Sequence, residues 1–339
     1  MSKREVIDIS NIQLNNDIDT RQKIFKSYNS YETCRSVKTC MVENLVGGCE
    51  GNIINAHSVS KKNGLSRISS LRESGLELVG KFKKSNTTTL NPLEQEYIEE
   101  YVSIESASTF YGLCRKHDNN LFKTIDESKT IKINYTTVYE YTLRNAIYNW
   151  YSRMSNRICA DKKRKKFNHK VHDRLYYEIL SREKVLENEV HYILNNYNNI
   201  ENRIWYKVDE IDGNLNIAGN FYEYNGETVI YTTLIPDKKK SYILVSGTKD
   251  NNILDIDKAI NFYTYENKED LYVSLSELLL QATSINDYFF NHKKWNSLPG
   301  KLKEDITNWL YLEDLDKSFN VNARYNIMNI PNFVGAMID

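Results

Sequence analysis

The chain has no excess charge of either sign, because its 45 lysines and arginines balance its 45 aspartates and glutamates. It therefore lacks an overall field that would draw in nucleic acid or an anionic membrane, and any site for a polyanion must be a local patch. It also lacks an apolar run of eighteen residues, and its opening MSKREVIDIS is too charged for a signal peptide. We expect a soluble, cytoplasmic protein with no membrane partner.

Cysteine is scarce and unevenly placed. Four of the five cysteines lie in two short segments, Cys34 to His57 and Cys114 to Asp118, and the second segment also contains His117. An odd number of cysteines that cluster with histidine in a cytosolic protein favours metal ligands over disulfides. Thiolate and imidazole groups are ligands suited to zinc.

One structural zinc ion can be assembled from the two segments, with Cys40, Cys49, Cys114 and His117 as its ligands. An ion bound there would stabilise a region that is otherwise rich in loops. Cys34 lies six residues before Cys40 and can replace Cys49, so the spacing alone leaves two candidate ligand sets.

The fold class that we predict is α+β. We expect an N-terminal arm over residues 1–33, a metal-binding module over 34–130 and a larger α+β domain over 136–339. The larger domain is predicted to contain long helices over 136–200, an antiparallel β-meander over 205–248 and further helices over 270–312.

Short elements are expected inside the metal-binding module. Residues 52–54 predict a strand that leads into His57, and apolar residues at helical spacing predict a short helix within 60–75. The Lys-, Ser- and Thr-rich stretch within 76–100 indicates an irregular connection. A second helix is expected to begin near Asp118 and to run through Ile125.

The region after residue 136 has the stronger periodicity. A broad apolar stripe runs from Val138 to Trp150, and a second one covers 171–197 after a basic link over 161–166. Asn225-Gly226 separates two apolar runs, which predicts a β-hairpin because both turn residues tolerate positive φ. Beyond it, we expect a helix from Asp270 to Phe290.

A family resemblance rests on the cysteine pair Cys40 and Cys49, the strand that ends in His57, and the sequence L-C-R-K-H-D-N-N-L-F from Leu113 to Phe122. Together these resemble the core of HNH-type endonucleases. The resemblance covers residues 34–126 and implies a zinc-stabilised treble clef, also called a ββα-metal fold. The wide gap within the cysteine pair departs from the tight C-x-x-C of the family.

The resemblance also implies roles for two side chains. In the family, the histidine that closes the first strand acts as general base on water, and His57 matches it. The residue after the last zinc ligand binds a divalent cation, and Asp118 stands where the family usually has histidine. A carboxylate there suits Mg²⁺ or Mn²⁺, and the implied reaction is metal-assisted phosphodiester hydrolysis. A helix N-cap is the simpler alternative for Asp118.

Two positions depart from the family pattern around the proposed base. Ala56 precedes His57, where the family often has Asp or Glu, and Thr109 stands at the position of the family's middle asparagine. Asn55 and Asn119 are the nearby asparagines that could take its place.

Two groups of basic residues are candidates for contacts with a phosphate backbone. Lys61 and Lys62 lie close in sequence to the metal segment and are the better placed of the two groups. Lys162, Lys163 and Arg164 belong to a dense basic run, for which a solvated linker is the alternative interpretation.

Two functions of different classes follow from the sequence. The first is a divalent-metal-dependent endonuclease that cuts DNA, with RNA as the second candidate substrate and, by analogy only, a phage-defence or mobile-element context. The second is a catalytically inactive zinc-finger-like module that binds nucleic acid or protein. In both, the region after residue 136 serves substrate binding, a partner subunit or a second copy of the chain.

Overall fold

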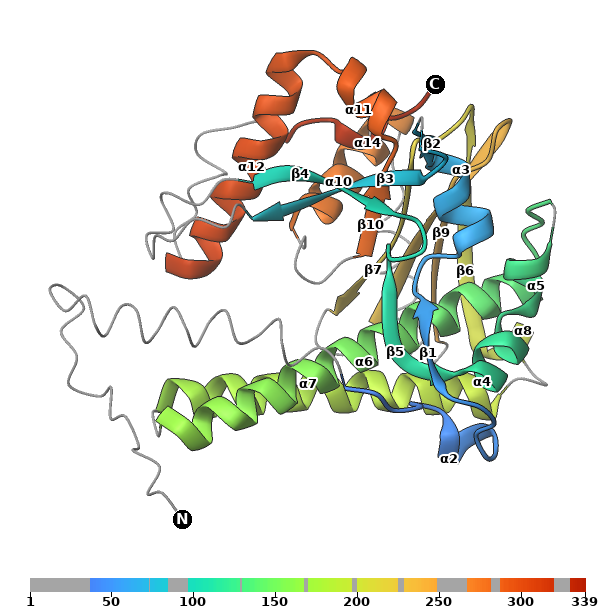
Figure 1. The fold of residues 1–339 in the computed structure, drawn as a ribbon, viewed down its shortest axis with the longest axis vertical. Helices are drawn as coiled ribbons and strands as arrows, with labels where there is room; N and C mark the ends of the chain where they lie inside the picture. The colour runs from blue at the N-terminus through green and yellow to red at the C-terminus, as the bar shows by residue number, and fades with distance from the viewer. Residues whose placement is uncertain are drawn as a thin grey trace, which may run out of the picture.

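The computed structural model describes most of the chain after residue 36. The predicted arm and Cys34 lie outside the described residues. The described ranges are 37–72, 74–84, 97–128, 130–167, 170–196, 200–224, 229–248, 267–281, 287–319 and 330–339. They form an α+β protein with an eight-stranded and a two-stranded antiparallel sheet, which confirms the predicted class (Figure 1).

The predicted meander forms one end of the large sheet. β7 (Ile217–Tyr224), β8 (Val229–Ile235) and β9 (Lys240–Thr248) are consecutive antiparallel neighbours, and β6 (Ile204–Asp212) pairs with β9 along its whole length. The hairpin prediction is confirmed by the pairing of β7 with β8, although its turn at 225–226 lies outside the described residues.

The other end of this sheet contains strands that the sequence did not predict. β10 (Asp287–Phe290) pairs with β7, and β3 (Glu77–Lys84) pairs with β10, β2 (Ser70–Leu71) and β4 (Tyr97–Ser103). The expected helix from Asp270 to Phe290 is therefore wrong over 287–290. The expected irregular connection is wrong over 81–84, where the start of the Lys-, Ser- and Thr-rich stretch belongs to β3. Strands from before residue 130 and from after residue 200 thus share one sheet.

The junction of β3 and β10 depends on a glycine. Gly80 pairs with Phe290, and a Cβ on Gly80 would lie 2.3 Å from the phenylalanine ring. Any side chain at this position would displace the ring, so the close approach of the two strands requires glycine here.

Two long helices follow the metal segments in sequence, as predicted. α6 (Tyr135–Phe167) and α7 (Lys170–Asn195) pack against each other. The basic run 161–166, expected to be a link, continues α6 instead. Lysine and arginine are good helix formers, and Asp161 forms ion pairs with Arg164 and Lys165, which lie three and four residues further along. None of the described helices is long and apolar enough to span a membrane.

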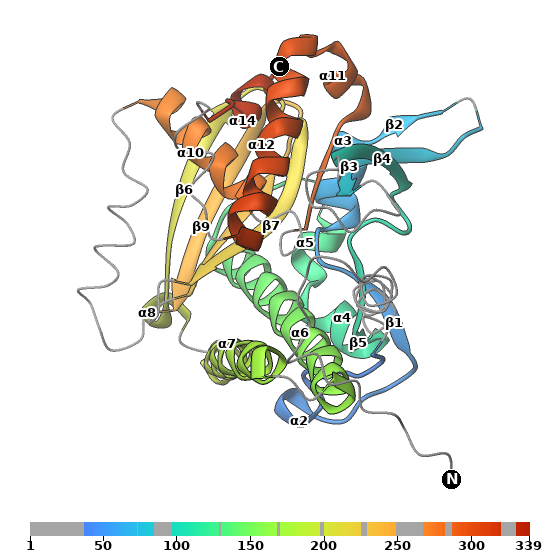
Figure 2. The same ribbon diagram turned by 90° about the vertical axis from the view of Figure 1, so that its left-hand side faces the viewer.

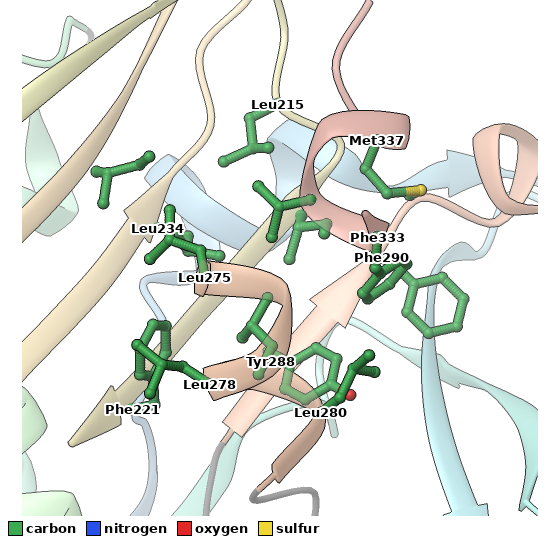
Figure 3. Close-up of a cluster of buried hydrophobic side chains, with 14 of the residues drawn as sticks. Leu215, Phe221, Leu234, Leu275, Leu278, Leu280, Tyr288, Phe290, Phe333 and Met337 are labelled. Atoms are coloured by element: carbon green, nitrogen blue, oxygen red, sulfur yellow. The ribbon is translucent and has the colours of Figure 1, made fainter. Parts of the chain in front are cut away.

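The large sheet is covered on both faces (Figure 2). α6 lies against one face, and α10 (Lys268–Gln281), α12 (Gly300–Phe319) and α14 (Phe333–Ala336) cover the other. Side chains of β8 alternate between the two cores: Leu234 belongs to the core with α10 that Figure 3 shows, and the next residue packs on the side of α6.

The small sheet holds the candidate functional residues. β1 (Ile53–His57) pairs with β5 (Thr109–Cys114), which leads into α4 (Arg115–Leu121) and α5 (Lys123–Glu127). The predicted strand into His57 is confirmed, and the predicted second helix is present but breaks at Phe122. Short elements complete the description: α2 (Glu43–Val46), η1, a π-helical turn (Lys61–Leu65), α3 (Ser66–Ile68), α8 (Ile200–Arg203) and α11 (His292–Ser297).

Candidate metal centre and the adjoining cleft

The four predicted zinc ligands meet in space. Their ligand atoms all lie within 4.8 Å of one another. The Nδ1 atom of His117 lies 3.2 Å from Sγ of Cys40, 3.3 Å from Sγ of Cys114 and 3.9 Å from Sγ of Cys49. The cysteine–histidine cluster, as we call these four residues, confirms the grouping that the sequence predicted with Cys49 as the fourth member.

The cluster has the dimensions of a tetrahedral zinc site. Zn–S and Zn–N bonds of about 2.3 and 2.0 Å place neighbouring ligand atoms roughly 3.5–3.8 Å apart. The observed separations of 3.2 to 3.9 Å from the imidazole to the sulfurs bracket that range. Among the residues that the structure describes, this is the one group of three or more cysteine, histidine or acidic side chains close enough to share an ion.

Local structure brings these four ligands together. Cys114 ends β5 and His117 lies in the first turn of α4, while the segment around Cys40 runs beside β5 through a hydrogen bond from Met41 N to the carbonyl oxygen of Gly112 (2.9 Å). The wide gap between Cys40 and Cys49 contains the short helix α2.

Backbone amides favour the thiolate form of one buried ligand. Burial raises the pKa of Cys114, but hydrogen bonds from the amides of His117 and Glu50, together with the neighbouring thiols, bring this pKa below its ordinary value. Burial dominates at Cys40 and raises its pKa, although the amides of Cys114 and Val42 act against it. Amide donors of this kind orient the sulfurs of the cluster.

A cleft of about 440 Å³ lies beside the cluster. Asp118 follows His117 in α4 but points into this cleft rather than into the cluster. The residues that line the cleft come from β1, η1, α3, α4, α5 and α6: His57, Lys61, Lys62, Ser66, Asp118, Asp126 and Arg144. The two side chains predicted to be catalytic therefore share one cleft.

His57 is held in an orientation suited to a base. It ends β1 opposite Thr109, and its Nε2 donates a hydrogen bond to the carbonyl oxygen of Ile104 (3.1 Å). With the proton on Nε2, Nδ1 carries the lone pair. Burial lowers the pKa of His57, and the positive charges of Arg144 and Lys61 act in the same direction. The ring is therefore neutral at pH 7.

Asp118 carries a buried oxygen without a partner. Its Oδ1 atom accepts no hydrogen bond from the described residues. Burial raises the pKa of this carboxyl, although the charge of Arg144 opposes the shift. The N-cap alternative is wrong, because the N-cap residue of α4 is Cys114 and Asp118 lies inside the helix. An unpartnered buried acceptor of this kind fits a bound cation.

An ion pair that the sequence analysis missed contributes to the cleft. Arg144 donates two hydrogen bonds to Asp126, one from Nη1 to Oδ1 (2.9 Å) and one from Nη2 to Oδ2, and Ser60 Oγ donates to Oδ1 (2.9 Å). Burial raises the pKa of Asp126, but these contacts outweigh it and lower the pKa. The guanidinium also lies over the ring of Phe122, 4.2 Å from its centroid.

The long helix α6 positions this pair. Glu140 and Arg144 are four residues apart and share a face of α6, and both are buried. Glu140 accepts hydrogen bonds from the backbone amides of Thr124 (3.2 Å) and Ile125 (2.8 Å), which fixes the start of α5. Two charged residues within the apolar stripe 138–150 were the signal that sequence reasoning passed over.

The structure divides the predicted basic residues. Lys61 and Lys62 line the cleft; Lys61 forms an ion pair with Glu105, and Lys62 Nζ donates to the carbonyl oxygen of Glu127 (2.7 Å).

The run of Lys162, Lys163 and Arg164 lies far along α6. Eighteen helical residues, or about 27 Å, separate Arg144 from Lys162. Arg164 pairs with Asp161 (2.8 Å), and the side chain of Lys163 lies outside the described atoms. The structure therefore does not bring this run to the cleft.

The candidate asparagines do not reach the cleft. Asn55 and Asn119 are both exposed, and neither is among the residues that line the cleft. Thr109, at the family's asparagine position, donates its hydroxyl to the carbonyl oxygen of Ser106 (3.2 Å).

Neither a family model nor a curated protein nor a solved structure matches the chain.

Proposed function

We propose that this protein is an HNH-like endonuclease that hydrolyses phosphodiester bonds in DNA with the help of a divalent cation. The observation that carries the proposal is the meeting of His57 and Asp118 in one cleft, directly beside a cysteine–histidine cluster. A base and a cation ligand in a common cleft are the minimum that metal-assisted hydrolysis requires.

The order of elements supports the treble-clef part of the proposal. β1 pairs antiparallel with β5, α4 follows directly, and the cluster joins the start of α4 to the segment before β1. A strand, a strand and a helix held by zinc is the arrangement that the resemblance implies. In this protein, a long insertion between the two strands reaches the large sheet.

The zinc ion has a structural role in this proposal. Three thiols and one imidazole fill all four positions of a tetrahedral ion, so no position stays open for water or substrate. The ion would fix the start of α4 and, through it, the position of Asp118.

His57 is the proposed general base. Its Nε2–H is held by the Ile104 carbonyl oxygen, so the Nδ1 lone pair can accept a proton from water while the water oxygen attacks phosphorus. The bond from phosphorus to the leaving oxygen then breaks, and the proton stays on His57 until it is released. A Mg²⁺ or Mn²⁺ ion held by Asp118 would neutralise the charge that develops on the phosphate and the leaving oxygen.

Lys61 and Lys62 are the proposed contacts to the phosphate backbone near the reacting bond. Both belong to η1 and line the cleft. Because the chain has no net charge, local cations of this kind must supply the attraction for a polyanion.

The test is cleavage of purified plasmid DNA, and of RNA in parallel, with Mg²⁺ or Mn²⁺. We expect cutting by the natural protein and loss of at least about 100-fold in rate for His57→Ala, because removal of a general base typically costs that much or more. His292→Ala is the matched control, since His292 lies on α11 and not in the cleft. Inert natural protein, or equal cutting by the His57 variant, would contradict the proposal.

The alternative is a zinc-stabilised module that binds nucleic acid or protein without catalysis. The observation that favours it is the absence of both candidate asparagines from the cleft lining. Under this alternative, the plasmid and the RNA stay intact with either metal, for the natural protein and for His57→Ala alike.

A further inference from the structure

The cleft contains two carboxylates from different helices. Asp126, on α5, lines the same cleft as His57 and Asp118, which lies on α4. We propose that Asp126 is the second carboxylate ligand of the catalytic cation. The inference rests on the proposed function for the presence of that cation.

The carboxylate of Asp126 has a ligand position to offer. Oδ1 accepts from Ser60 and from Arg144, whereas Oδ2 accepts a single hydrogen bond, from Arg144. A carboxylate offers about four acceptor positions, two on each oxygen, so one on Oδ2 is not used. The side chain is 36% exposed although its partner Arg144 is 2% exposed, which leaves the carboxylate accessible from the cleft.

Two buried atoms in the residues around this carboxylate lack partners among the described residues. One is an acceptor, Oδ1 of Asp118, and the other is a donor, Nε of Arg144. Both residues line the cleft. A buried acceptor is satisfied by a hydrogen-bond donor or a cation, and a buried donor by an acceptor. A divalent cation together with a phosphate oxygen supplies both kinds of partner.

Two carboxylates are enough for the cation in question. Mg²⁺ keeps several bound waters and is held through one or two carboxylates and substrate phosphates. Mn²⁺ takes the same kinds of oxygen ligands. Such a site differs from the cysteine–histidine cluster, which offers four protein ligands to one ion. Arg144 acts as a positioning residue here, because its two hydrogen bonds fix both oxygens of Asp126.

The test is titration of Mn²⁺ into the zinc-containing full chain by calorimetry, without nucleic acid. We expect Asp126→Asn and Asp118→Asn each to weaken Mn²⁺ binding by at least about tenfold, since each removes a charged ligand. Glu105→Gln is the matched control: Glu105 is an exposed carboxylate paired with Lys61 and does not line the cleft. An unchanged affinity in Asp126→Asn, or no binding of Mn²⁺ by the natural protein, overturns the inference.

A second variant tests the inference if Asp126→Asn does not fold. Asp126→Glu keeps the negative charge beside Arg144 but moves the carboxylate by one methylene. A ligand role predicts weaker Mn²⁺ binding at unchanged thermal stability and zinc content, and equal Mn²⁺ affinity overturns the inference.

Cleavage is measured separately, so the two proposals can fail independently. If the natural protein cleaves DNA but Asp126→Asn binds Mn²⁺ with unchanged affinity, this inference is overturned and the proposed nuclease function is not affected. Mn²⁺ binding that requires both carboxylates, without cleavage of DNA or RNA, supports the ligand assignment and removes the nuclease function.

Discussion

The cysteine–histidine cluster and the cleft lie side by side but are built in different ways. The cluster takes its four side chains from two short sequence segments, and their ligand atoms could share one metal ion. The cleft takes its lining from six elements, including α6. A group of potential metal ligands can thus be recognised from the residue types in two short segments, whereas a cleft depends on how distant elements dock.

The largest expected effect comes from breaking the cluster. Cys114→Ser should abolish the zinc content of about one ion per chain and lower the free energy of unfolding by more than about 4 kcal/mol, because loss of a structural metal is among the most destabilising changes. Elemental analysis and thermal unfolding measure the two effects. Cys159→Ser is the control, since Cys159 is a buried cysteine outside the cluster. Full stability in zinc-free protein would remove the structural role of the ion.

Breaking the ion pair of the cleft should have a smaller effect and should spare the zinc. Arg144→Met removes the charged partner of Asp126. We expect the free energy of unfolding to fall by about 3 kcal/mol, which is the low end for a buried ion pair, because the carboxylate is 36% exposed. Urea unfolding checks this value. Arg182→Met, which breaks an exposed pair with Glu178, should cost less than about 0.5 kcal/mol. Loss of zinc in Arg144→Met would show that cluster and cleft are not independent.

The pH dependence of the cleavage rate and of stability tests the protonation of His57 in the cleft. Because burial lowers the pKa of His57, the base stays neutral as the pH falls past the ordinary histidine pKa of about 6.5. The cleavage rate should stay flat to below that pH and then fall about tenfold per pH unit. Stability should also decline below pH about 6.5, since the unfolded chain binds a proton there that folded His57 does not. A rate that falls already above neutral pH would contradict the assignment.

The smallest effects are expected from the basic residues. Lys61→Gln and Lys62→Gln should each weaken DNA binding several-fold and reduce the slope of log affinity against log salt by about 1. Lys162→Gln, about 27 Å along α6 from Arg144, should change binding at the cleft less. Fluorescence anisotropy over a salt series measures both quantities. A larger effect at Lys162 would place the main nucleic-acid contact on α6 instead.

The secondary structure that the sequence mispredicted is the part that depends on tertiary pairing. The Lys-, Ser- and Thr-rich stretch within 76–100 was expected to be irregular, yet its first residues, 81–84, belong to β3, where Lys81 and Lys83 pair with Glu100 of β4. Residues 287–290 were expected to be helical, but a short aromatic run fits strand or helix equally well. Residues 287–290 form a strand because they lie between β3 and β7 and pair with both.

The sequence by itself determined the long helices, the antiparallel meander and three members of the cysteine–histidine cluster, Cys40, Cys114 and His117. It left Cys34 and Cys49 as alternatives for the fourth member, and the structure places Cys49 there. Apolar periodicity over many residues and the restricted ligand chemistry of thiols and imidazoles are local properties, so they can be read without coordinates.

Only the tertiary structure decided that Asp126 and Arg144 complete the cleft of His57 and Asp118. Their pairing spans eighteen residues and depends on the docking of α5 against α6. A lone aspartate and a lone arginine carry no spacing signal, and only their burial against each other makes them part of a site.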